Sequence, residues 1–575
     1  HHWLRVVLEG EGENTNGMGA QVSLWAGRKL FYQEQSPQRG FQSSVDLRLL
    51  FGLGSTAQID SLVVNWPDGR VSKQQNVPTN QEVVVPQTEA VEKEESTHKV
   101  VDSDIWFTEV NNEEVGLDFM HQENDFVDFD RDQLLFHMIS REGPAVAVGD
   151  VNGDGREDIY VGGAKDQASE LFVQQANGLF ANRQAEDFEN DKISEDVAAM
   201  LFDADGDNDL DLYVGSGGNE FPSSSSALAD RLYVNDGAGN FQRDTEALAY
   251  RFESTGTVAA ADYDQDGDQD LFVGMRLRPF LYGVPVSGYI LQNDGAGKFT
   301  NVTSQVAPDL KEIGMVTDSK WVDIDQDKDL DLVVVGEWMG VQLFVNEQGK
   351  LINSSEAWNL SGSEGWWSCV EIADLDQDGD HDLIVGNHGL NSRFKASLEK
   401  PISLWVNDFD RNGTAEQIIT TYNGEQAYPL TLRHDLVMQV PQLKKKFLKY
   451  ANYQGKTIED IFSPQQIEGA VRRDVRTLES SIFYNERGKF ERKSLPTEAQ
   501  FSPVQTVKVQ DINNDGKLDL LLGGNFSGAK PEVGQYNASY GTLLIQQADG
   551  WKALKANESG LNVKGVTKHW AMIPN

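Results

Sequence analysis

The sequence predicts an all-β protein: a β-propeller of seven blades (six to eight) that follows a small β-sandwich or barrel and carries one helical insertion. An acidic motif recurs seven times, and each copy joins two apolar segments rich in β-branched and aromatic residues. Hairpin sequences such as "RLYVNDGAGNF" and "YILQNDGAGKF" follow several copies. Four short antiparallel strands in a repeat of about 50 residues are typical of a propeller blade.

Composition divides the chain into three parts. Residues 1–87 are predicted to form the separate β unit, with strands within "WLRVVLEG", "AQVSLWAG", "VDLRLLFGLG", "IDSLVVNWPDG" and "NQEVVVPQ". Residues 88–103 are polar, charged and free of aromatic side chains, which predicts a linker. The propeller is expected over 104–575, and apolar residues at helical spacing predict helices at about 430–470, between strands of one blade. The lysines of this insertion form either a solvated face or a docking surface.

The acidic motif reads D-x-[DN]-x-[DN]-G-x-x-[DE], and its copies start 53, 59, 61, 51, 34 and 103 residues apart. Alternate positions bring side-chain oxygens to one side of a tight loop, and glycine at position 6 permits the bend. Asn208 and Lys328 replace that glycine in two copies. Four side-chain oxygens, the main-chain carbonyl of position 7 and water would give Ca²⁺ its six to eight hard ligands, whereas Mg²⁺ demands stricter geometry. The sequence therefore predicts about seven Ca²⁺ sites.

Positions 1, 3, 5, 7 and 9 of the seven loops are the predicted metal ligands. They are Asp150, Asn152, Asp154, Arg156 and Asp158; Asp203, Asp205, Asp207, Asp209 and Asp211; Asp262, Asp264, Asp266, Asp268 and Asp270; Asp323, Asp325, Asp327, Asp329 and Asp331; Asp374, Asp376, Asp378, Asp380 and Asp382; Asp408, Asp410, Asn412, Thr414 and Glu416; and Asp511, Asn513, Asp515, Lys517 and Asp519. At position 7 the ligand is the main-chain carbonyl.

A helix–loop–helix calcium site shares the start of this motif but needs a bidentate Glu at position 12. Position 12 is an apolar strand residue in every copy: Val161, Val214, Val273, Val334, Val385, Ile419 and Leu522. This observation excludes the helix–loop–helix alternative. Acidic turns that only improve solubility would not repeat the same donor spacing seven times.

Charge and cysteine content restrict the function further. The 575 residues carry 49 basic and 91 acidic side chains, a net charge of −42, which repels phosphate backbones and makes nucleic acid a poor partner. The one cysteine, Cys369, excludes an internal disulfide and is expected to be a buried strand thiol. No apolar run approaches the length of a transmembrane helix, and no signal peptide is present in this chain.

The repeats resemble the FG-GAP/VCBS repeats of integrin α-like calcium-binding propellers, and "NGMGAQVSLWAG" and "IDSLVVNWPDG" resemble an ASPIC/UnbV domain. The combination is similar to the cartilage-acidic-protein-like family and to surface proteins of Bacteroidota. The resemblance implies an extracellular or cell-surface location, with bacterial outer-membrane association. It also implies a missing upstream part and ligand-binding loops opposite the calcium face, with candidates at 217–230, 275–288, 386–400 and 524–540. The end of the chain, "VKGVTKHWAMIPN", resembles the opening strand of a further blade, "IGMVTDSKWVDID".

Three functions are compatible with these features. The favoured one is a non-catalytic, calcium-stabilised scaffold for adhesion, protein–protein interaction or glycan capture, with an envelope or extracellular protein, a glycan or a larger surface complex as partner. The alternative is a lyase-like enzyme acting on polysaccharide, with His388 near Arg393 as its candidate base. RNA binding comes third because of the charge. Five tryptophans serve either as sugar-stacking platforms or in packing: Trp338, Trp358, Trp366, Trp367 and Trp405.

Overall fold

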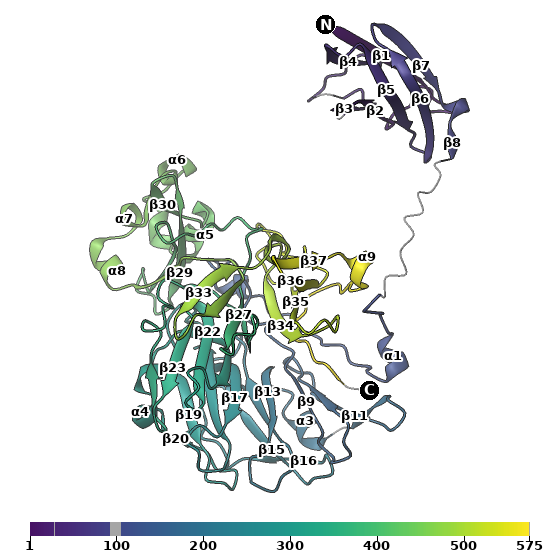
Figure 1. The fold of residues 1–575 in the computed structure, drawn as a ribbon. Coiled ribbons are helices and arrows are strands. Elements are labelled where there is room, and N and C mark those ends of the chain that lie inside the picture. The colour runs from purple at the N-terminus through teal and green to yellow at the C-terminus, as the bar shows by residue number, and fades with distance from the viewer. Residues whose placement is uncertain (28, 39, 93–104, 184, 574–575) are drawn as a thin grey trace. The chain divides into compact units, whose positions relative to one another are not determined.

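The structure, a computed structural model, describes residues 1–27, 29–38, 40–92, 105–183 and 185–573. The chain divides into two compact units, His1–Asp104 (unit 1) and Ile105–Asn575 (unit 2) (Figure 1). Both units are built from strands with a few short helices, as expected for an all-β protein, and the strands pair antiparallel except for β1 (His2–Glu9) and β7 (Gln81–Pro86), which are parallel. Among the described residues, no helix has the length and apolar character needed to cross a bilayer.

Unit 1 is a sandwich of two sheets. The first has the order β4 (Leu49–Gly54), β1 (His2–Glu9), β7 (Gln81–Pro86), and the second has the order β3 (Lys29–Glu34), β2 (Gln21–Ala26), β5 (Gln58–Asn65), β6 (Arg70–Pro78), β8 (Val91–Glu92). Strand β4 shows the alternation that makes a sandwich, because Leu49, Phe51 and Leu53 are buried while their neighbours are exposed. All five predicted segments contain a strand. Strands β3 and β6 were not predicted, since most of their side chains are polar.

The predicted linker at 88–103 starts too early. The 3₁₀ turn η1 (Gln87–Glu89) continues from β7, and strand β8 then pairs with β6 through Val91 and Val71. Residues 88–92 therefore belong to unit 1. Composition predicted a linker here because it does not show that β8 pairs with β6, a strand of mostly polar residues. The rest of the predicted linker, 93–103, lies outside the described residues.

Unit 2 contains seven sheets in its described part, and six of them form a series that is numbered here in chain order. Their strand orders are β12–β11–β10–β9 (sheet 1), β13–β14–β15–β16 (sheet 2), β17–β18–β19–β20 (sheet 3), β21–β22–β23–β24 with β25 beside β22 (sheet 4), β26–β27–β32–β33 (sheet 5) and β34–β35–β36–β37 (sheet 6). In each sheet, the acidic loop joins the first strand to the second.

The bounds of these strands are β9 (Val146–Gly149), β10 (Asp158–Val161), β11 (Glu170–Gln174), β12 (Phe180–Arg183), β13 (Asp196–Phe202), β14 (Asp211–Ser216), β15 (Arg231–Asn235), β16 (Phe241–Asp244), β17 (Ser254–Ala261), β18 (Asp270–Leu277), β19 (Gly288–Gln292), β20 (Thr300–Asn301), β21 (Met315–Val322), β22 (Asp331–Met339), β23 (Gln342–Asn346), β24 (Leu351–Asn353), β25 (Gly365–Trp366), β26 (Cys369–Ala373), β27 (Asp382–Gly386), β32 (Ser481–Asn485), β33 (Phe490–Ser494), β34 (Val504–Gln510), β35 (Asp519–Gly524), β36 (Thr542–Gln547) and β37 (Gly550–Leu554). Short helices lie before, between and after them: α1 (Asn112–Val115), α2 (Asp128–Arg131), α3 (Glu186–Asn190), η2 (Ser226–Leu228), α4 (Thr303–Val306), η3 (Pro308–Leu310), η5 (Thr497–Gln500) and α9 (Ala556–Ser559).

A further sheet is inserted into sheet 5, between β27 and β32. Its order is β30 (Gln426–Pro429), β29 (Glu416–Asn423), β28 (Ile402–Asn407), β31 (Val471–Val475). The loop that starts at Asp408 joins β28 to β29, so it belongs to this inserted sheet rather than to a sheet of the series. The second hairpin of sheet 5 follows only after the insertion, which explains the irregular interval of 103 residues between the last two motifs.

The predicted helical insertion lies within this sheet, between β30 and β31. It consists of α5 (Arg433–Gln439), η4 (Pro441–Lys444), α6 (Tyr450–Tyr453), α7 (Ile458–Ile461) and α8 (Pro464–Glu468), which gather at one corner of unit 2 (Figure 1). Leu443 and Phe447 are buried in a cluster that includes Phe409, while Leu448 and Tyr450 are exposed. The helices therefore cover the inserted sheet near its acidic loop.

Consecutive sheets contact one another through the main chain. The Asp196 amide of sheet 2 donates to the Gly163 carbonyl after sheet 1 (3.0 Å), and the Thr567 amide donates to Gly524 of sheet 6 in the same way (2.8 Å). The His569 ring lies near the Pro144 carbonyl, just before sheet 1. The segment near the C-terminus thus lies beside sheet 6 as the first strand of a following sheet would, and it reaches toward sheet 1.

Candidate metal centres

The acidic loops owe their shape to two residues with left-handed φ. In the loop from Asp262, Gln265 at position 4 has φ 62° and Gly267 at position 6 has φ 101°. Positions 4 and 6 adopt positive φ in every copy, including Lys328 at 81°. Glycine is favoured at position 6 because it has no Cβ to clash in this conformation. The loop therefore imposes the same backbone on lysine, which was the weaker fit to the motif.

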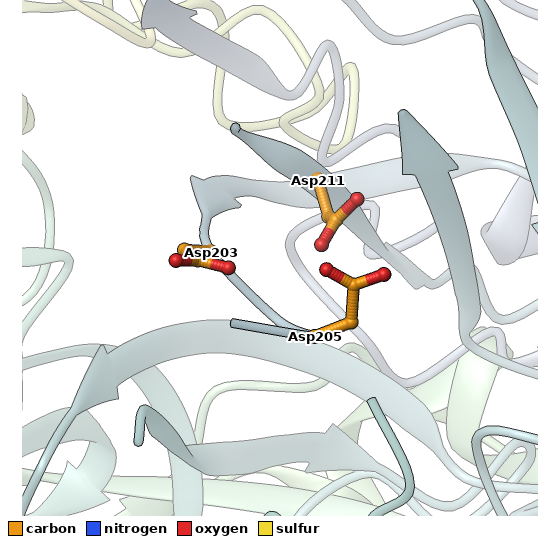
Figure 2. Close-up of side chains that lie close together, drawn as sticks. All are labelled: Asp203, Asp205 and Asp211. Carbon is orange, nitrogen blue, oxygen red and sulfur yellow. The ribbon is translucent and has the colours of Figure 1, made fainter. Parts of the chain in front are cut away.

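The loop from Asp203 shows how the carboxylates converge (Figure 2). Asp203 accepts from the amides of Gly206 (2.8 Å) and Asn208 (3.1 Å). Asp211 accepts from the amides of Ala204 (2.9 Å) in the loop and, through its other oxygen, from the third strand. Asp205 and Asp211 point toward each other, and one oxygen from each of Asp203, Asp205 and Asp211 lies within 4.8 Å of the others. The main chain thus holds two of the three carboxylates, those of Asp203 and Asp211, against the mutual repulsion of the group.

Five such groups occur within the described residues. They are Asp203, Asp205 and Asp211; Asp262, Asp264 and Asp270; Asp323, Asp325 and Asp331; Asp374, Asp376 and Asp378; and Asp408, Asp410 and Glu416. In the fourth group, Asp378 at position 5 takes the place of Asp382 at position 9. Positions 1 and 3 join in all five groups, whereas most predicted ligands at positions 5 and 7 lie outside them.

Carboxylate oxygens that lack a hydrogen-bond donor indicate whether these groups fit a cation. Several buried carboxylate oxygens have no hydrogen-bond partner among the described residues: those of Asp205, Asp209, Asp264, Asp268, Asp270, Asp323 and Glu416. A buried charge without donors is costly unless a proton or a cation neutralises it. Burial, together with neighbouring carboxylates, raises the pKa of Asp270 and of Asp331 to about 7. An all-oxygen set of this kind matches the preference of Ca²⁺.

The first and last loops form no group of three clustered carboxylates in the described chain. Both have Asn at position 3, and in the first loop the Asn152 amide donates to Asp158 (3.2 Å). The Arg156 guanidinium pairs with Asp154, so its side chain neutralises a predicted ligand while only its carbonyl could bind an ion. In the last loop the Asn513 amide donates to Asp515 (3.1 Å). Within these two loops, side chains therefore donate to the carboxylates of the same loop, which no side chain of the other five loops does among the described residues.

Position 4 has a role that the motif did not reveal. The Gln265 amide donates to the Lys328 carbonyl (3.2 Å) and to Asp329 (2.6 Å) in the next loop. Gln326 bonds the Asp374 loop in the same way, through Gly379 and Asp380. The motif leaves position 4 open, so it does not single out these glutamines. The structure shows that position 4 has a left-handed φ in every copy.

Gln377 makes the corresponding bond from the Asp374 loop. Its amide donates to Gly516 of the last loop (2.7 Å), so the series of bonds skips the inserted loop from Asp408. The loops of sheets 3 to 6 are therefore linked in order by glutamine side chains.

Side chains of the third strands link the sheets as well. The Asn235 amide donates to the Val151 carbonyl in the loop of sheet 1 (2.8 Å), and the Asn293 amide donates to the Ala204 carbonyl in the loop of sheet 2 (2.8 Å). Asn346 does the same toward sheet 3. Each loop is thus held by its own sheet and by the next, so an ion bound in it would stabilise the contact between sheets.

The other candidates from the sequence are mostly packing residues. Three of the five tryptophans are buried: Trp338, Trp366 and Trp367. Trp358 packs against Phe490, and the Arg472 guanidinium lies over Trp405 (5.0 Å). Packing, rather than sugar stacking, explains these side chains. Cys369 is buried in β26, and burial raises the pKa of its thiol.

His388 does not pair with Arg393. Its ring stacks on His137 (centroids 5.3 Å apart), and burial lowers the pKa of His388 well below its usual range. The Arg393 guanidinium instead lies over the Phe136 ring (5.4 Å). His388 is therefore a neutral, buried ring in an aromatic cluster.

Comparison with known families agrees with this geometry. The family model described as ASPIC and UnbV matches residues 10–92, and the FG-GAP-like repeat model matches 150–214, 203–273 and 323–385. The chain contains an ASPIC/UnbV domain followed by FG-GAP-like repeats. Each repeat match runs from one acidic loop to the second strand of the next sheet. The resemblance noted in the sequence is thus confirmed, and the matched FG-GAP-like repeats include four of the five carboxylate groups.

Individual proteins are only distantly similar. No match was found among curated proteins. The crystal structure of the V. cholerae biofilm matrix protein Bap1 is 11% identical over 75% of this chain and 90% of that one, with a TM-score of 0.30. The structure of Saccharomyces cerevisiae Sqt1 is 12% identical over 77% and 100%, with a TM-score of 0.32. Scores this low give no basis for transferring fold or function.

Proposed function

We propose that this protein is a non-catalytic, calcium-stabilised scaffold at the cell surface or outside the cell. The FG-GAP-like repeats and the ASPIC/UnbV domain support a surface or protein-interaction role. In this proposal the six sheets are blades of a propeller, and the segment around Thr567 is the first strand of a seventh position. In this proposal the inserted sheet, which carries the Asp408 loop, stands outside the ring of blades.

The observation that carries the proposal is the convergence of three carboxylates in each of five loops. In four of these loops, buried carboxylate oxygens lack donors within the described residues. Carboxylates in this arrangement repel one another unless a cation is bound. The glutamine and asparagine bonds connect each loop to its neighbour. Calcium in these loops would therefore make the sheets rigid with respect to one another, as a scaffold requires.

Partner binding is proposed for the end of unit 2 opposite the acidic loops. The predicted binding loops meet there under residues 126–141: the Arg131 guanidinium lies over Phe280 (4.1 Å), and the Met138 amide donates to Gly528 (2.7 Å). The covering segment and the loop edges would then contact an extracellular or envelope protein, or a glycan. A net charge of −42 favours such partners over RNA.

Binding arrays of envelope proteins and glycans, probed with and without a chelator, test the proposal. A scaffold should retain specific partners in millimolar calcium and lose them in EGTA, with partial loss in Asp264→Asn. Asp309→Asn, an exposed acidic residue outside the loops, is the matched control. Calcium-independent folding together with no retained partner would contradict the proposal.

A polysaccharide-acting enzyme is the second candidate, because of one cavity. His388 and His137 line a cavity of about 500 Å³ between the first strands of the sheets, together with Arg276 and Glu337. The Nε2 atoms of both rings lack partners in the described part of the chain. Product release from acidic polysaccharides, abolished by His388→Ala without a change in melting temperature, would replace the scaffold proposal by this one.

A further inference from the structure

A second type of carboxylate cluster lies in unit 2, away from the acidic loops. Glu195, between α3 and β13, is 0% exposed. Its only described donor is the Glu142 amide at 3.4 Å, and its Oε2 atom is buried without a partner among the described residues. Burial, and then the charges of Glu220 and Glu123, raise the pKa of Glu195 well above its usual range. This carboxylate needs a proton or a cation.

Nearby Asp128 shows how the same fold neutralises a buried carboxylate when no ion is needed. It is also 0% exposed, but it accepts from the amides of Ile139 and Ser140, from the Ser140 hydroxyl (2.6 Å) and from Asn219 (2.9 Å). Four donors make Asp128 a structural acceptor. The contrast shows that the lack of donors at Glu195 is a local property rather than a general property of this region.

Glu220, in the loop after β14, and Glu123, before α2, face Glu195. The Glu195 and Glu220 carboxylates are neighbours, since each acts on the pKa of the other. The Asn124 amide binds Oε1 of Glu220 (2.9 Å) and the His121 ring binds Oε1 of Glu123 (3.1 Å), while the Oε2 atoms of both glutamates are buried and have no partner in the described chain. In each glutamate one oxygen is therefore held by a neighbour and the other is free.

The surroundings supply access but little positive charge. Glu123 and Glu220 line a surface pocket of about 680 Å³, so an ion could enter from solvent. Within the described residues neither Glu195 nor Glu220 forms an ion pair, because Arg276 binds Glu142 (2.8 Å) and Glu337 instead. Lys568 lies near Glu142 and Glu123, and burial lowers its pKa.

We propose that Glu123, Glu195 and Glu220 bind a divalent cation of the calcium class, at a site separate from the FG-GAP-like loops. Three carboxylates and water from the pocket supply hard oxygen ligands, and His121 orients Glu123 from outside the ligand set. The three glutamates are not among the groups whose oxygens all lie within 4.8 Å of one another, so ion binding would draw Glu123 inward. The ion would join three segments that are distant in sequence: the residues before sheet 1, the entry to sheet 2 and the loop after β14.

Calcium binding by the intact chain tests this site. Equilibrium dialysis in excess calcium should give one ion fewer for Glu195→Gln and for Glu220→Gln than for the unmodified protein. Crystals soaked in Mn²⁺ should show an anomalous peak between Glu195 and Glu220. Glu186→Gln, the same substitution at an exposed position in α3, should leave both results unchanged.

A shared proton is the competing explanation. It predicts equal ion counts for all variants, no anomalous peak, and Glu195 and Glu220 oxygens in a short hydrogen bond, and this set of results would overturn the proposal. The loop ions serve as an internal standard, because their peaks must be present in the same crystals. If the loop ions are absent while the Glu195 peak is present, the scaffold proposal fails and this one stands.

Discussion

The loop from Asp262 and the loop from Asp150 share one motif but neutralise their charge differently. In the Asp262 loop, carboxylate oxygens of Asp264 and Asp270 are buried with no described donor. In the Asp150 loop, Asn152 and Arg156 supply donors within the loop itself. Two residues out of nine therefore separate a loop with buried carboxylate oxygens that lack donors from a loop with side-chain donors of its own. We expect the side chains at positions 3 and 7, rather than the motif as a whole, to set the dependence on metal.

Removing calcium should have the largest effect. At free calcium about tenfold above the dissociation constant, each occupied site adds about 1.4 kcal/mol to the free energy of unfolding. Five occupied loops should together contribute about 7 kcal/mol, which for a unit of this size should lower the melting temperature in EGTA by about 7 °C, measured by differential scanning calorimetry. Magnesium at the same concentration is the control and should restore little. An unchanged transition in EGTA would show that the loops balance their charge without an ion.

The calcium-dependent part of this stability should grow with pH. Without metal, the raised pKa values of Asp270, Asp331 and Glu416, each about 7, mean that the folded state holds protons which the unfolded chain releases near pH 4. Stability from these groups is therefore complete below about pH 4 and lost as pH rises to about 7. In calcium the ion replaces the proton, so this loss should disappear.

The measurement is the difference in melting temperature between calcium and EGTA at pH 5, 6, 7 and 8. The difference should widen over this range, because protons compete with the ion at the acidic end. A constant difference would mean that the loop carboxylates ionise normally in the metal-free protein.

Exchanging position 3 between the two kinds of loop tests the comparison directly. Asp264→Asn should remove one charged ligand and weaken that site about tenfold, or about 1.4 kcal/mol. Asn152→Asp should place a third carboxylate beside those of Asp150 and Asp158 in the first loop. Calcium binding there should increase, and the free energy of unfolding in EGTA should fall. Equilibrium dialysis of both variants, with Asp309→Asn as control, gives the number of ions. If Asn152→Asp binds no additional ion, Arg156 alone decides the first loop.

Much of this arrangement could be predicted from the sequence, for identifiable reasons. The spacing of the motif determines which oxygens converge, because the spacing and the φ angles of a nine-residue loop are local properties. Asp203, Asp205 and Asp211 were therefore predicted as metal ligands from the sequence alone. The place of the Asp408 loop could not be found, because β27 pairs with β32 across about 90 residues and only long-range pairing reveals the insertion. The Glu195 cluster was missed for the same reason, since its three glutamates come from separate segments with no shared motif.

The link between neighbouring loops should give the smallest effect. Gln326→Asn keeps an amide that tolerates the left-handed φ of 65°, but the shorter side chain cannot reach Gly379 and Asp380. Loss of two exposed hydrogen bonds should cost about 1 kcal/mol and should weaken calcium binding in the Asp374 loop slightly. Gln348→Asn is the matched control, because Gln348 has a similar φ of 56° and an exposed side chain. Equal melting temperatures for the two variants would show that each loop binds its ion independently, whereas a selective loss in Gln326→Asn would show that one loop helps to order the next.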